Sequence, residues 1–124
     1  MKRAAFLRDL SSEHHQALVL SRKIAQAGDQ AGTALVAEVR SIFTAELEPH
    51  FRVEEETLLP ALAATGETEL VAQTLADHRS LRKLVERLDQ RGALAEFGAQ
   101  LKAHVHFEER ELFEACQALF DDQD

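Results

Sequence analysis

Four stretches of the chain carry apolar residues at intervals of three and four, and a histidine interrupts each of these rows near its middle. Residues at such intervals share one face of an α-helix, so each stretch predicts an amphipathic helix with one histidine on its buried face. Four such helices joined by short loops bury their apolar faces against one another. We therefore expect an all-α protein, an up-down-up-down antiparallel four-helix bundle. The interrupting histidines are His14, His50, His78 and His104.

Breaks between the apolar rows set the expected boundaries within a single domain of residues 1–124. We expect Ser11 and Thr33 to cap the first two helices, because their hydroxyls can accept free backbone N–H groups. Residues 1–10 form a lead-in segment, and residues 121–124 form an acidic tail. The expected helices cover about residues 11–27, 34–64, 69–90 and 93–120.

Pro49 lies inside the second expected helix, directly before His50. Proline removes one backbone hydrogen bond, so we expect the helix to bend there. The alternative is a break that divides this helix and gives five segments. We favour a bend, because Phe43 and Leu47 continue the face that carries His50.

The composition limits the classes of partner. The chain has 22 acidic and 14 basic residues, a net charge of −8, which disfavours nucleic acid and anionic membranes as partners. Because no apolar run approaches membrane-spanning length and no cleavable leader is visible, we expect a cytoplasmic protein. The single cysteine, Cys116, cannot form an intramolecular disulfide; we expect a small buried residue, with a redox thiol as the alternative.

Two of the histidines belong to a sequence repeat. Residues 50–61, HFRVEEETLLPA, recur as residues 104–115, HVHFEERELFEA, with five of the twelve positions identical. Each copy places a glutamate four residues after the histidine, on the same helix face, so each pair can chelate a cation. A weaker repeat places an acid directly before each of the other two histidines, as Glu13-His14 and Asp77-His78.

Packing the four rows together would gather four imidazoles and two carboxylates in the middle of the bundle. Two buried carboxylates without partners would each cost several kcal/mol, whereas two divalent cations shared between them would satisfy the whole set. Mixed imidazole and carboxylate ligands suit iron, with manganese or zinc as substitutes. The candidate metal ligands are His14, His50, Glu54, His78, His104 and Glu108.

Neighbouring polar residues are expected to lie off the ligand face. His15 is about 100° around the helix from His14, and apolar neighbours favour His14 as the inward residue. His106 should point outward. We expect Glu55 and Glu109 to face solvent; the alternative is that they hydrogen-bond the metal ligands.

No His-Glu-x-x-His and no Glu-x-x-His motif occurs, so zinc-protease and ferritin-like sites are not supported.

These motifs resemble the hemerythrin-like, or HHE cation-binding, family. HFRVEEETLLPAL is similar to the second-helix motif of that family and HVHFEERELF to its fourth, within a resemblance that extends from about Leu7 to Leu119. The resemblance implies a four-helix bundle that holds a non-haem di-iron centre with an oxo or hydroxo bridge. By motif position, the implied ligands are the six candidate residues named above.

The third helix departs from the pattern of oxygen-carrying hemerythrins, which have His-x-x-x-His there. Thr74 lies four residues before His78 and Arg82 four residues after it. We therefore do not expect a dedicated oxygen carrier. The resemblance to bacterial single-domain relatives implies interaction with dioxygen, nitric oxide or peroxide in sensing, iron handling or stress defence. A di-iron enzyme with peroxidase or oxidase activity and a metal-free helical interaction module are the alternatives, and homodimerisation stays open.

Overall fold

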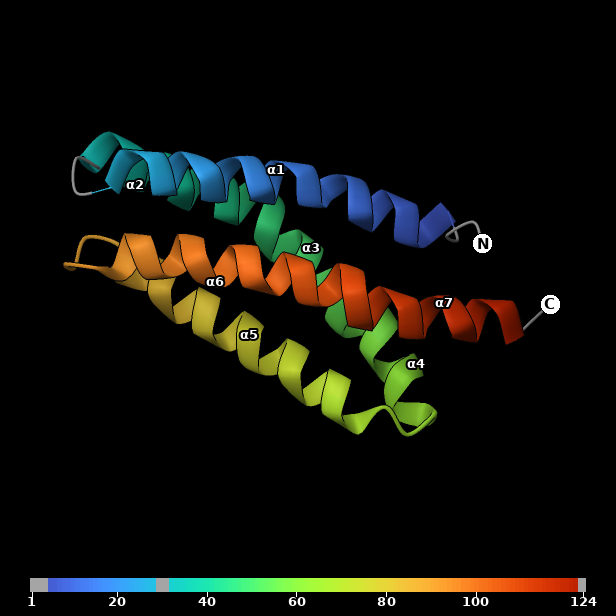
Figure 1. Ribbon diagram of the computed structural model, residues 1–124. Coiled ribbons are helices and arrows are strands. Elements are labelled where there is room, and N and C mark those ends of the chain that lie inside the picture. Colours follow the sequence, from blue (N-terminus) through green and yellow to red (C-terminus); the bar gives the residue numbers. More distant parts are fainter. Residues whose placement is uncertain (1–4, 29–31, 123–124) are drawn as a thin grey trace.

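The computed structural model describes residues 5–28 and 32–122, with side chains up to Leu119, and shows the expected antiparallel four-helix bundle (Figure 1). Successive long helices run in opposite directions, so both ends of the described chain lie at one end of the bundle. The first helix is α1 (Ala5–Ala27) and the third is α5 (Thr68–Glu86). The second consists of α2 (Thr33–Ile42), η2 (Phe43–Leu47), α3 (Glu48–Val53), η3 (Glu54–Leu58) and α4 (Leu59–Ala64). The fourth consists of α6 (Ala93–Phe107), η4 (Glu108–Leu112) and α7 (Phe113–Asp122).

Three helix ends differ from the sequence prediction. The helix α1 begins at Ala5, so most of the expected lead-in is helical and Ser11 is not its cap. Because Leu7 and Leu10 are buried, this early part of α1 extends the core. The helix α2 begins at Thr33 with Gly32 as its N-cap, and α5 ends at Glu86 rather than near residue 90.

The predicted acidic tail is helical at its start, since α7 continues through Asp122; residues 123 and 124 lie outside the described part. Within that part, no helix is both long enough and apolar enough to cross a membrane.

The second helix is continuous through both prolines, so it does not divide into two. A wide π-helical turn, Phe43–Leu47, comes just before Pro49, and a second, Glu54–Leu58, comes just before Pro60. Residues four apart on an α-helix drift by about 40° around the axis, whereas a π-turn holds more residues per turn. The wide turns thereby keep side chains four residues apart on the buried face, and the fourth helix gains the same effect from its π-turn, Glu108–Leu112.

The apolar core is divided into two clusters. One includes Ile24, Phe43 and Phe97, towards the end of the bundle where α5 connects to α6. The other includes Leu7 and Phe113, towards the end where the described chain starts and finishes. The four histidines that interrupt the apolar rows are all buried, and they lie outside both apolar clusters. The polar residues between the clusters are therefore sheltered from solvent.

The helices α1 and α6 approach closely at Gly98. A Cβ atom at this position would lie 2.9 Å from Cγ2 of Ile24, which is itself buried. On the same face, the Ser21 hydroxyl donates a hydrogen bond to the Gly98 carbonyl oxygen at 2.8 Å. The absence of a side chain at residue 98 thus sets the distance between the helices that carry His14 and His104.

Candidate metal centre

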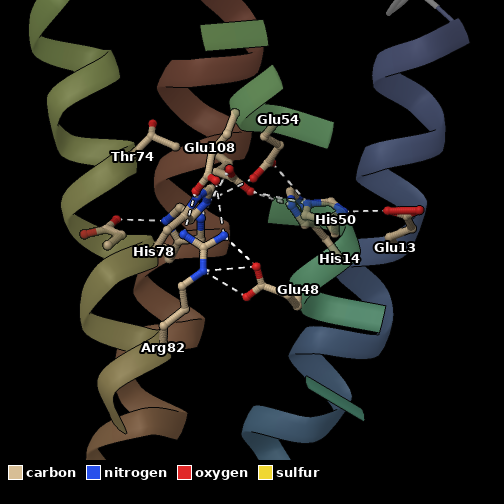
Figure 2. A network of polar contacts seen from close by, with 12 residues as sticks. Glu13, His14, Glu48, His50, Glu54, Thr74, His78, Arg82 and Glu108 are labelled. Atoms are coloured by element: carbon tan, nitrogen blue, oxygen red, sulfur yellow. Dashed lines mark hydrogen bonds and ion pairs between the residues drawn. The ribbon is translucent and has the colours of Figure 1, made fainter. Parts of the chain in front are cut away.

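The six predicted ligand residues meet in the middle of the bundle (Figure 2). They form two groups, and in each group the ligand atoms all lie within 4.8 Å of one another. His14 and His50 belong to the first group, His78 and His104 to the second, and Glu54 and Glu108 to both. Each group could hold a metal ion, and the two groups have both carboxylates in common.

His14 Nε2 and Glu108 Oε1 are hydrogen-bonded to each other at 2.8 Å, whereas six other atoms that face the centre are buried and lack hydrogen-bond partners within the described residues. They are Nε2 of His50, His78 and His104, both carboxylate oxygens of Glu54, and Oε2 of Glu108. The glutamate residues themselves are 0% exposed. Native proteins rarely leave so many buried polar atoms unsatisfied in one place, because each costs about 1–3 kcal/mol. Divalent cations between these atoms would satisfy them, so the donor set fits metal binding.

Distances between the facing atoms also fit this interpretation. His50 Nε2 lies 3.1 Å from Glu54 Oε2, and His78 Nε2 lies 3.1 Å from Glu54 Oε1. Around the other glutamate, His104 Nε2 lies 3.2 Å from Oε2 and His14 Nε2 lies 2.8 Å from Oε1. Each glutamate therefore presents one oxygen to a histidine of the first group and the other oxygen to a histidine of the second.

A second set of carboxylates contacts the outer nitrogen, Nδ1, of each of the four central histidines. The contacts of the first group are His14 with Glu109 at 3.0 Å and His50 with Glu13 at 2.5 Å. Those of the second group are His78 with Glu55 at 2.6 Å and His104 with Asp77 at 2.8 Å. A proton on Nδ1 lets each ring donate to its carboxylate, which leaves the Nε2 lone pair for a metal. This pattern is typical of metal-binding histidines.

The sequence prediction for Glu55 and Glu109 is corrected in favour of its alternative. Both side chains point to a histidine of the centre rather than wholly to solvent. The outer roles of Glu13 and Asp77 were missed, although the weak repeat had singled out both residues. Each acid contacts a histidine of another helix, and intrahelical spacing carries no information on that pairing.

Charge within the centre is unbalanced when no cation is considered. Burial lowers the pKa of His50, but the nearby carboxylates of Glu108 and Glu54 outweigh burial and raise it to about 11. The pKa of His104 likewise rises to about 10, because Glu108 outweighs burial. Burial and the neighbouring Glu108 raise the pKa of Glu54, whereas the cationic His104 holds the pKa of Glu108 low despite its burial. The site therefore favours bound positive charge, which protons or metal ions can supply.

The remaining sequence-predicted residues lie off the centre. His14 is buried and His15 is exposed, as predicted, and His106 is half-buried and belongs to neither ligand group. Thr74 is fully buried one turn before His78, and its hydroxyl donates to the Leu70 carbonyl at 2.8 Å.

Cys116 is 2% exposed, and burial, with the charges of the two central glutamates, raises its pKa to about 12. The cysteine is thus the small buried residue that the sequence led us to expect.

A cavity of about 260 Å³ leads to the first ligand group between α1 and α3. The cavity is lined by His14, His50 and Phe51, and it also touches His104 and Glu108. Several apolar side chains also line it, namely Ala17, Ala45, Leu47, Val53, Leu101 and Val105. A small uncharged molecule could therefore reach the first group without passing through the apolar core.

Comparison with known proteins gives one match. The family model described as the hemerythrin HHE cation binding domain matches residues 5–116, which contain all six central residues. No curated protein and no solved structure matches the chain.

Proposed function

The chain belongs to the hemerythrin HHE cation-binding domain family, and we propose that it is a non-haem di-iron protein whose metal pair interacts with a small ligand. Two four-residue groups share Glu54 and Glu108, and six of their buried polar atoms have no hydrogen-bond partner among the described residues; this observation carries the proposal. Nitrogen and carboxylate donors without thiolate are the ligand chemistry that suits iron, and manganese or zinc can occupy the same donors.

In this proposal, His14 and His50 would hold one iron and His78 and His104 the other, and Glu54 and Glu108 would contribute to both positions. Iron at such a site would supply one-electron redox chemistry and an affinity for dioxygen, nitric oxide or peroxide. The surrounding residues fix the imidazoles through their Nδ1 atoms and shelter the centre between two apolar clusters.

The ligand is proposed to be small and uncharged, because the cavity that reaches His14 and His50 is largely apolar and its solvent-exposed lining residues include Glu13 and Glu46. Acidic groups at an entrance disfavour anions and leave neutral molecules unaffected. Dioxygen, nitric oxide and hydrogen peroxide all meet this condition. Sensing, iron handling and oxidative or nitrosative defence are the roles that such a site supports.

Metal analysis with absorption spectroscopy tests the proposal. The protein loaded anaerobically with ferrous iron should retain about two ions per chain, and exposure to air should produce near-ultraviolet ligand-to-iron charge transfer. Glu54→Ala should lose both ions, because Glu54 belongs to both groups. The matched control is Glu56→Ala, an exposed residue on the same turn, which should retain them. Failure of the unaltered protein to retain iron under reducing, iron-replete conditions would contradict the proposal.

A di-iron enzyme is the second candidate, and the cavity favours it, since about 260 Å³ exceeds what a diatomic molecule needs. Peroxidase or oxidase activity on a small substrate would then be measurable as steady-state turnover. Turnover that disappears in both His50→Ala and Glu54→Ala would support the enzyme. A single stoichiometric oxidation of the bound iron without turnover would support binding alone.

A further inference from the structure

The residue that we single out is Arg82, whose side chain lies beside the second ligand group without contributing a ligand atom (Figure 2). We propose that Arg82 is a positioning residue that holds Glu55 in place and thereby aims the Nε2 atom of His78 at its metal position. The inference rests on the ligand role proposed for His78. A guanidinium is permanently cationic and does not coordinate metals, so any effect of Arg82 passes through its partners.

The guanidinium of Arg82 binds two carboxylates from different turns of the second helix. Nε donates to Glu48 Oε2 at 2.8 Å, and Nη2 donates to Glu48 Oε1 at 2.8 Å. Nη1 donates to Glu55 Oε2 at 2.9 Å, with a longer contact of 3.2 Å between Nη2 and Glu55 Oε1. Such two-pronged pairs fix geometry more tightly than single ion pairs. Arg82 therefore ties α5 to both α3 and η3.

The oxygen that Arg82 holds is the oxygen that binds His78. Glu55 Oε2 lies 2.9 Å from Arg82 Nη1 and 2.6 Å from His78 Nδ1. The Glu55 side chain is 22% exposed, so without the guanidinium it could rotate towards water. The arginine thus keeps this carboxylate in the one orientation in which it accepts the Nδ1 proton.

The face of the His78 ring is fixed as well. Phe51 stacks on His78 with ring centroids 4.0 Å apart and planes 11° apart, and Arg82 lies 5.7 Å from the centroid of Phe51. Stacking restricts tilting of the imidazole, but it leaves rotation within the ring plane free. The hydrogen bond at Nδ1 restricts that remaining motion, and Nε2 then points at Glu54, 3.1 Å away.

The test compares Arg82→Gln and Arg82→Lys with the matched control Arg40→Gln. Arg40 also bridges to α5, through the Val85 carbonyl at 3.2 Å, but it touches no residue of the centre. In the cobalt(II)-loaded protein, each ligating histidine should give one exchangeable, paramagnetically shifted Nδ1–H resonance. Arg82→Gln should shift or broaden a single one of these, the same resonance that Glu55→Gln affects.

Metal affinity gives an independent measurement. Loss of a residue that orients a ligand typically lowers affinity about 10–100-fold, and competition with a chelator should show this loss for one of the two ions in Arg82→Gln. Arg82→Lys keeps the charge but lacks the planar guanidinium that donates to two carboxylates, so its metal affinity should remain lowered. The metal affinity of Arg40→Gln should match that of the unaltered protein. Unchanged resonances and affinity in Arg82→Gln, or full rescue by lysine, would overturn the proposal. If the unaltered protein takes up no metal, the proposed function itself fails.

Discussion

Replacing Glu54 by glutamine should change stability in opposite directions with and without metal. Glu54 is fully buried, and neither of its carboxylate oxygens has a hydrogen-bond partner among the described residues. Glutamine has the same shape and no charge. Burial and repulsion from Glu108 oppose the charged form of Glu54. A buried carboxylate charge that its neighbours do not fully compensate costs several kcal/mol, whereas an unsatisfied amide costs about 1–3 kcal/mol. Without metal, the free energy of unfolding of the variant should therefore equal that of the unaltered protein or exceed it by up to about 2 kcal/mol.

The effect with metal follows from linkage. An ion that binds only the folded state adds about 2.7 kcal/mol when its free concentration is about one hundred times the dissociation constant, so two ions add about 5 kcal/mol. For a chain of this size, about 1 kcal/mol corresponds to roughly 4 °C in Tm, so chelation should lower the Tm of the unaltered protein by about 20 °C. Because Glu54 is shared by both positions, Glu54→Gln should lose most of this shift.

Thermal unfolding followed by circular dichroism at 222 nm measures both effects. Each protein is melted with excess zinc, which avoids oxidation, and again with excess chelator. The exposed neighbour Glu56 provides the control, and Glu56→Gln should keep the full metal-dependent shift. A chelator-insensitive Tm in the unaltered protein would refute the reasoning and favour the metal-free interaction module. A Glu54→Gln variant that still shifts by about 20 °C would refute the shared role of Glu54.

Three further predictions concern the packing and the assignment of side chains. Gly98→Ala should lower the free energy of unfolding by about 1–2 kcal/mol in denaturant titrations, because the overlap with Ile24 at 2.9 Å outweighs the gain in helix propensity. His14→Ala should halve or abolish iron content by elemental analysis, whereas His15→Ala should leave it unchanged, since only His14 is buried at the centre. The Cys116 thiol, with a pKa of about 12, should be only about one part in ten thousand thiolate at pH 8. Iodoacetamide should therefore label it slowly until the protein unfolds, and rapid labelling of the native protein would contradict the buried assignment.

The helical class and the six central residues could be predicted from the sequence because both depend on local spacing. Apolar residues at intervals of three and four define a helix face, and His-x-x-x-Glu places both donors on that face. The helix ends were predicted less well. Ser11 and Thr33 have the chemistry of caps, but packing of Leu7 and Leu10 extends α1 to Ala5.

Contacts between helices were the part that the sequence could not assign. The sequence by itself determined that four helices would each bring a histidine, and two of them a glutamate, to a common buried face. Only the tertiary structure decided which outer carboxylate holds which histidine, such as Glu13 on His50 and Asp77 on His104. The tertiary structure also decided that Arg82 donates a hydrogen bond to Glu55. The physical reason is that periodicity within a helix fixes the direction of a side chain, whereas its partner on another helix depends on the axial offset and π-turns that packing selects.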